Sequence, residues 1–107
     1  MINNNLLNRF IAEALIYKTS EKSLTQKEVS IALNVSESFL SDCIHGRKKF
    51  NVKHLYLMTY QLNIDPDFIF PNKNTFELIK NSLNYKDFNT FLTDLNSQIY
   101  KEEYNNE

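Results

Sequence analysis

The segment LTQKEVSIALNVSESFLSDCIHG, residues 24–46, limits what this chain can fold into more than any other part of it. Thr25 stands before a stretch of helical periodicity and Glu28 follows three residues later, which is the pattern of a capping box. It predicts a helix over about residues 26–33. Asn34 tolerates the left-handed backbone conformation that often ends a helix. The first half of the segment therefore predicts a short helix with a defined start and end.

A second short helix is predicted directly after the first. Ser36 is a favourable N-cap, and Leu40, Cys43 and Ile44 recur at helical spacing over residues 37–45. Gly46 can end this helix as a C-terminal cap. Two short helices joined by a sharp turn form the helix-turn-helix unit, in which one helix supports a second that can lie in a DNA major groove.

Three motifs in this segment carry a resemblance to a known family. They are Leu24-Thr25-Gln26, Leu33-Asn34-Val35-Ser36 and Gly46-Arg47-Lys48-Lys49. The segment from Leu24 to Phe70 resembles the phage-repressor-like (Cro/CI-type, XRE) helix-turn-helix family, with no gap. The resemblance implies an all-α fold, with a compact four-to-five-helix lambda-repressor-like DNA-binding domain in residues 1–71. A helical C-terminal extension, residues 72–107, would follow it.

The flanking parts of this domain also have helical patterns. Asn3, Asn4 or Asn5 can cap a first helix that runs to about residue 18 and has an apolar stripe at Leu7, Phe10, Ile11, Ala14 and Leu15. Asn51 can cap a helix over about 52–62, with Leu57 and Tyr60 facing outward. We expect its inner face to consist of Val52, Leu55, Met58, Thr59 and Leu62. Asp65 and Pro66 then begin a short helix that stops before Pro71.

The extension predicts two further helices, over about residues 75–83 and 85–104, separated at Asn84. The longer one has an apolar stripe made of Phe88, Phe91, Leu92, Leu95 and Ile99. Such a stripe has to be covered, either by the chain's own domain or by a second copy. We expect the long helix to pair with a second copy, which makes it the dimerisation element.

Charge and composition narrow the range of functions. The net charge of −1 is not typical of a non-specific nucleic-acid binder, and the only dense basic cluster is Arg47-Lys48-Lys49. The single cysteine, Cys43, argues for a reducing compartment, so we expect a cytoplasmic protein. No apolar run is long enough to cross a bilayer, and the first residues lack a signal-peptide pattern, so we expect no membrane association.

The resemblance and the helix geometry together select the candidate contact residues. Those expected to reach base edges are Glu37, Ser38, Ser41 and Asp42. Those expected at the phosphate backbone are Gln26, Lys27, Ser36, Phe39, His45, Arg47, Lys48, Lys49 and Asn51. Positions 37 and 42 are commonly basic or amide in the family. Here they are acidic, which allows a bond to cytosine N4 but repels phosphate. The helix therefore either reads a cytosine-containing site or faces another partner.

The pattern indicates a regulator rather than an enzyme, because no catalytic triad, phosphate loop or metal-ligand spacing is present. We therefore expect no cofactor and no metal. The principal hypothesis is a transcriptional regulator, by default a repressor, that binds a palindromic operator in double-stranded DNA as a homodimer. One alternative is a protein-interaction module, such as an antitoxin-like protein or a phage-encoded inhibitor or antirepressor. Another is a DNA-binding domain whose extension responds to a ligand.

Overall fold

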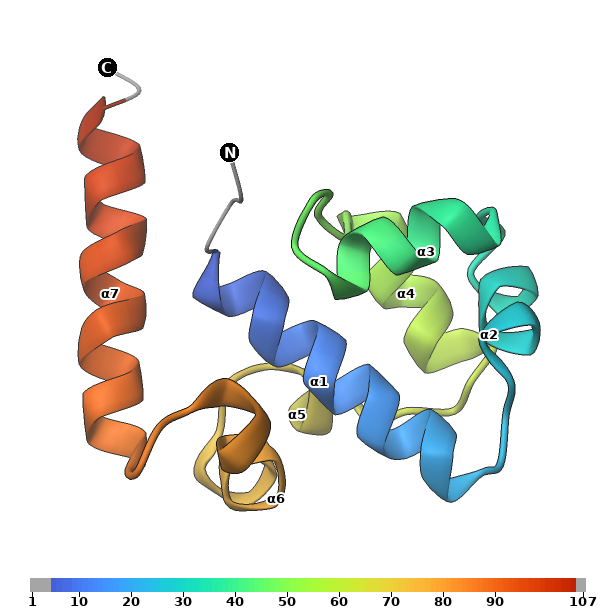
Figure 1. The fold of residues 1–107 in the computed structure, drawn as a ribbon, viewed down its shortest axis with the longest axis horizontal. Coiled ribbons are helices and arrows are strands. Elements are labelled where there is room, and N and C mark those ends of the chain that lie inside the picture. Colours follow the sequence, from blue (N-terminus) through green and yellow to red (C-terminus); the bar gives the residue numbers. More distant parts are fainter. Residues whose placement is uncertain (1–4, 106–107) are drawn as a thin grey trace.

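The computed structural model describes residues 5–105, with side chains as far as Lys101. Its helices are α1 (Leu6–Glu21), α2 (Gln26–Ala32), α3 (Glu37–Ile44), α4 (Val52–Tyr60), α5 (Pro66–Ile69), α6 (Lys73–Leu83) and α7 (Phe88–Asn105) (Figure 1). The described residues contain no strand. They form a compact body of 36 × 30 × 22 Å with a radius of gyration of 13.8 Å. The predicted all-α fold class is confirmed.

Most helices begin at the polar side chains that the sequence indicated. The Asn5 side chain accepts the Asn8 backbone N–H at 2.9 Å, whereas Asn3 and Asn4 lie outside the described residues. Thr25 and Glu28 form the expected capping box at the start of α2. Ser36 accepts the Phe39 backbone N–H at 3.0 Å at the start of α3. These helix starts are set by hydrogen bonds that span three residues.

The predicted helix ends are also observed, and they share one backbone conformation. Asn34, Asn63 and Asn84 have φ angles of 57°, 55° and 62°, and Gly46 has a φ of 79°. Glycine and asparagine enter this left-handed region at the lowest cost. Each of these residues therefore turns the chain sharply out of a helix.

Two starts in the extension differ from the sequence expectation. α6 begins at Lys73 because Asn72 accepts the Thr75 backbone N–H at 2.8 Å. α7 begins only at Phe88, because the Asp87 carboxylate accepts the Thr90 backbone N–H at 2.8 Å. The residues after Asn84 form a connection rather than the first turn of the long helix.

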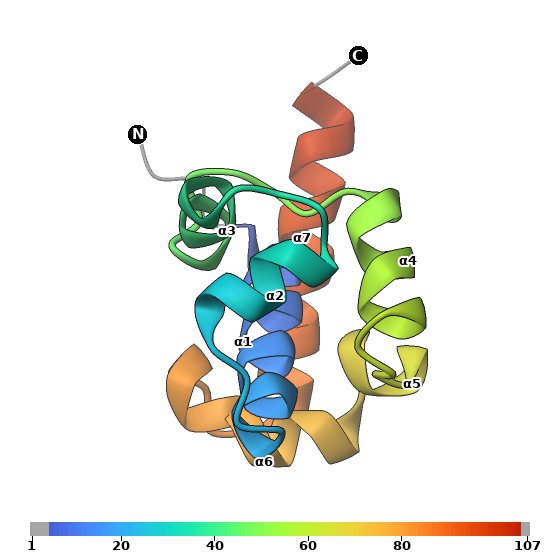
Figure 2. The same cartoon turned by 90° about the vertical axis from the view of Figure 1, so that its right-hand side faces the viewer.

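The core has two parts that share α1, which runs through the middle of the molecule (Figures 1 and 2). The first part joins α1 to the segment from α2 to α5 and consists of Ile11, Leu15, Val29, Leu33, Leu40, Met58, Leu62, Ile64 and Ile69. The second part joins α1 to α6 and α7 and consists of Leu6, Phe10, Ala14, Phe76, Ile79, Leu83, Phe91 and Leu95. Helix α1 is therefore buried on two sides.

The apolar stripe of α7 is used inside the chain, which corrects the expectation that it is free for a second copy. Phe91 is 0% exposed and Leu95 5% exposed, and the Phe91 ring lies 5.6 Å from that of Phe10. Phe88 and Leu92 are half-buried against the same core. Of the five expected dimerisation residues, only Ile99 is exposed. The reason is that α1 carries a second apolar side, which the extension covers.

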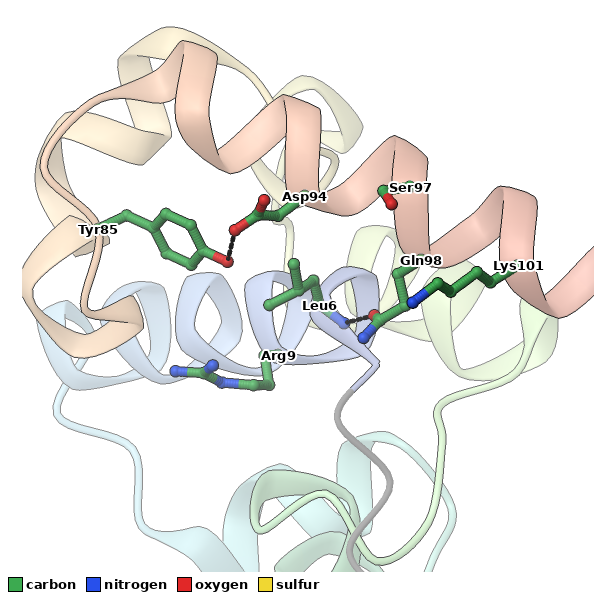
Figure 3. Close-up of a pocket in the computed structure, with 7 residues that line it drawn as sticks. All are labelled: Leu6, Arg9, Tyr85, Asp94, Ser97, Gln98 and Lys101. Carbon is green, nitrogen blue, oxygen red and sulfur yellow. Dashed lines mark hydrogen bonds between the residues drawn. The ribbon is translucent and has the colours of Figure 1, made fainter.

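Polar contacts join α1 to the extension and also hold the extension together. The Leu6 backbone N–H donates to Gln98 Oε1 at 2.6 Å, and the Tyr85 hydroxyl donates to Asp94 Oδ2 at 2.9 Å (Figure 3). Arg9 extends from α1 to donate to the backbone oxygens of Ser82 and Leu83 at the end of α6. The extension is thus joined to the first helix by hydrogen bonds as well as by apolar burial.

The outward face of α4 also differs from the expectation. Val52, expected in the core, is 82% exposed, because it lies at the first helical position beyond the edge of the core. Leu57, expected outside, is half-buried and packs against the first part of the core. Tyr60 is exposed as expected.

Candidate nucleic-acid interface

Helix α3 is held in place by its inner face and by a buried amide. Leu40 and Cys43 are at most 1% exposed, and burial raises the pKa of the Cys43 thiol to about 11. Asn8 of α1 donates from Nδ2 to the Cys43 backbone oxygen at 3.1 Å, and its Oδ1 accepts the Phe50 backbone N–H at 2.9 Å. One side chain therefore fixes both the end of α3 and the loop that follows.

Sequence reasoning did not identify Asn8 as part of this site. The available signal is a second stripe on α1, in which Asn8, Ala12, Leu15 and Thr19 recur at helical spacing and are all buried. A polar residue on a buried helix face usually has a hydrogen-bond partner. The stripe alone could not indicate that this partner is the loop after α3.

The expected base-contact residues lie on the side of α3 that faces solvent. Glu37 and Ser38 are exposed, and Ser41 and Asp42 are half-buried. Ser36 is exposed, and its hydroxyl oxygen caps the helix. The polar face of α3 is therefore accessible. Its two acidic side chains differ in exposure, because Glu37 is exposed and Asp42 is half-buried.

Asp42 forms ion pairs with two of the expected phosphate contacts. Its Oδ1 lies 2.9 Å from Arg47 Nε, and its Oδ2 lies 3.6 Å from Lys48 Nζ. The Asp42 backbone oxygen also accepts the backbone N–H groups of Arg47 and Lys48, at 2.8 and 3.2 Å. The hydrogen bond from Arg47 lowers the pKa of the Asp42 carboxyl. One carboxylate therefore offsets two cations at the end of α3.

An aromatic contact connects α3 to α4. The Phe39 ring lies 5.2 Å from the His54 ring, and Lys48 Nζ lies 5.3 Å from the centre of the Phe39 ring. Phe39 is thus partly covered, and it orients Lys48 rather than projecting freely. His45 is exposed, and its Nδ1 lies 2.8 Å from the Ser41 backbone oxygen.

The remaining contact candidates are distributed around this surface. Gln26 and Lys27 are exposed at the start of α2, and Lys49 is exposed in the loop after α3. Asn51 is exposed, but its Oδ1 accepts the His54 backbone N–H at 3.0 Å, so its amide nitrogen is the group that is open to a ligand. The structure pairs Asp42 with Arg47 and Lys48 and places Lys48 over the Phe39 ring, whereas Glu37 and Ser38 lie outside this cluster.

His54 is a buried histidine that packs beside this surface. It is 6% exposed, and its Nδ1 accepts the Asn51 backbone N–H at 3.0 Å, which completes the capping box of α4. Burial first, and then the charge of Lys53, lower the pKa of His54. Protonation would remove the acceptor at Nδ1 and place a charge between the rings of Phe39 and Phe50.

We expect the protein to lose stability as the pH falls below about 6.5, the ordinary value for histidine. The unfolded state binds this proton more tightly, so the free energy of unfolding is at its full value above that pH and decreases below it. Denaturant titrations at pH 7.5 and 5.5 measure this. His54→Gln, which can keep the capping box, should reduce the loss, whereas His45→Gln on the exposed surface should not. An equal loss in wild type and His54→Gln contradicts this assignment.

Other features of the described region lie away from α3. A polar cleft of about 420 Å³ between α1 and α7 is lined by Arg9, Asp94, Lys101 and their neighbours (Figure 3). Among the side chains that the structure describes, no group of three or more histidine, cysteine or acidic residues is placed to hold a metal ion. Among the described helices, none combines the length and apolar character needed to span a bilayer.

Comparisons of the chain with protein-family models, with curated proteins and with solved structures found no match. The resemblance to the phage-repressor-like family therefore rests on the motif residues alone.

Proposed function

We propose that this protein is a sequence-specific DNA-binding regulator of the phage-repressor-like helix-turn-helix type. In this proposal α3 is the recognition helix and α2 supports it. The protein would bind a two-fold operator as a homodimer and act by default as a transcriptional repressor in the cytoplasm. The observation that carries the proposal is the combination of an exposed polar face on a rigidly held α3 with Arg47, Lys48 and Lys49 directly after it.

The geometry supports separate roles for the residues of this surface. Ser38 and Glu37 are exposed near the start of α3, where recognition helices contact base edges. Arg47 and Lys48 lie at its other end, where phosphates can compete with Asp42 for them. The Asp42 ion pairs lower the positive charge offered to any DNA, so we expect weak non-specific binding and a larger dependence on the correct base sequence.

The acidic side chains also favour a second candidate function, a module that binds a protein. Glu37 is exposed and makes no ion pair among the described residues. A basic surface on a partner protein would complement it. The two functions differ in their response to salt, because DNA binding releases counterions and weakens steeply as salt rises.

Selection from a random duplex library at two salt concentrations tests the proposal. We expect an enriched palindrome with half-sites separated by about one helical turn. Lys48→Ala should weaken binding to all sequences alike and reduce the slope of log K against log salt by about 1. Lys86→Ala is the matched control and should leave both unchanged, because Lys86 is an exposed lysine in the connection between α6 and α7. Figure 1 shows this connection on the other side of α1 from α3. No enrichment at either salt concentration would favour the protein-binding module.

A further inference from the structure

The outward face of α4 is an apolar stripe that nothing in the described chain covers. Val52, Tyr56 and Tyr60 are spaced by four residues and are 82%, 61% and 65% exposed. The two tyrosine rings lie 5.7 Å apart with their planes only 9° from parallel, so they stack against each other on the surface of the helix. Figure 2 shows α4 at the outer edge of the molecule, with no helix on its far side. Three neighbouring exposed side chains of this kind are typical of an interaction surface.

We infer that this stripe is the surface by which two copies of the chain associate, with their α4 helices antiparallel about a two-fold axis near Tyr56. The inference takes from the proposed function only the expectation that the protein is a homodimer. It gives that dimer a different surface from α7, whose Phe91 and Leu95 are buried within the chain.

The stripe is complementary to itself. Lys53 is exposed and lies seven residues, or two helical turns, before Tyr60 on the same side of α4. In an antiparallel pair the Lys53 end of one helix meets the Tyr60 end of the other. Each Lys53 ammonium then lies against the partner copy's Tyr60 ring, where a cation is attracted by the aromatic face. Such reciprocal contacts are what a two-fold interface requires.

The charges at the two ends of α4 also favour an antiparallel partner. The first turn of α4 contains Lys53 and no acidic residue, although the positive end of a helix dipole favours acidic side chains. Its last turn contains no basic residue. An antiparallel partner places its negative helix end beside Lys53. Pairing therefore relieves an unfavourable arrangement that the single chain retains.

Antiparallel pairing through α4 is also compatible with the candidate nucleic-acid interface. None of the expected base contacts lies on this stripe, so pairing leaves the polar face of α3 open.

Sedimentation equilibrium without DNA tests the inference on the full chain. We expect wild type to dimerise and Tyr56→Asp to weaken dimerisation by at least about 30-fold, the loss typical of a central interface residue. Tyr100→Asp is the matched control, since Tyr100 is a 72% exposed tyrosine on α7. It should leave the dimer intact. Circular dichroism should show both variants folded, because both side chains project into solvent.

The lysine contact has a test of its own within the same experiment. Lys53→Glu should weaken the dimer and Lys53→Arg should retain it. A monomeric wild type, a Tyr56→Asp variant that still dimerises, or loss of the dimer in Tyr100→Asp would each overturn the inference. The last of these would assign the interface to α7. Because no DNA is present, a protein that dimerises through α4 but selects no operator would contradict only the proposed function.

Discussion

Replacing Phe91 by alanine is expected to lower the free energy of unfolding by about 3–5 kcal/mol, the usual cost of removing a buried phenylalanine. Phe91 is fully buried, and its ring lies within 5.6 Å of the rings of Phe10, Phe76 and Tyr85. Alanine would leave a cavity among these rings that the rigid helices α1 and α6 cannot close. Denaturant unfolding followed by circular dichroism measures the loss.

Tyr100→Ala on the same helix is the control for Phe91→Ala. Tyr100 is largely exposed, so its removal should change stability by no more than about 0.5 kcal/mol. Protein concentration separates the two possible roles of α7. If Phe91 were buried between two copies, the effect of Phe91→Ala would depend on protein concentration. A loss that is independent of concentration supports burial within one chain, and a loss below about 1 kcal/mol contradicts it.

Asn8→Ala is expected to cost about 2–4 kcal/mol, because it leaves two backbone groups without their partners. These groups are the Cys43 oxygen at the end of α3 and the Phe50 N–H in the loop after it. Asn8 is 6% exposed, so water cannot readily replace the amide. Chemical denaturation measures the cost, and Asn89→Ala on the exposed side of α7 is the matched control, for which we expect little change.

Asn8→Asp separates the two hydrogen bonds of this side chain. Aspartate has nearly the same shape and can still accept from the Phe50 N–H, but its second oxygen cannot donate to the Cys43 oxygen when ionised. We expect Asn8→Asp to be destabilised at neutral pH and to recover part of its stability in acid relative to wild type. Equal stability of wild type and both Asn8 variants would show that Asn8 does not hold α3 in place.

The dual role of α1 explains why the extension was harder to predict than the first five helices. Its sequence shows apolar residues at Leu7, Phe10, Ile11, Ala14 and Leu15, which is a stripe wide enough to be divided between two partners. Periodicity shows that such a stripe is buried but does not identify what covers it. The structure assigns Ile11 and Leu15 to the first part of the core, and Phe10 and Ala14 to the part shared with α6 and α7.

The same limit applies to the candidate site. The sequence placed Asp42, Arg47 and Lys48 near one another, since five or six residues separate them along the chain. It did not show that the carboxylate and the two cations form ion pairs, because the turn at Gly46 decides where the loop returns. The exposed stripe of α4 was also missed in part, because Val52 was assigned to the core on spacing alone.

What the sequence determined by itself is where the helices of the first 71 residues begin and end, within a few residues. Thr25, Ser36 and Asn51 cap helices through bonds that reach three residues along the chain, and Asn34 and Gly46 end them through their own backbone preferences. These interactions are local, so the residues next to each helix end are enough to predict them. Tertiary structure alone decided that α7 covers α1, that Asn8 holds the end of α3, and that α4 keeps an uncovered face. Those outcomes depend on which distant surfaces fit together, and residue spacing does not record that information.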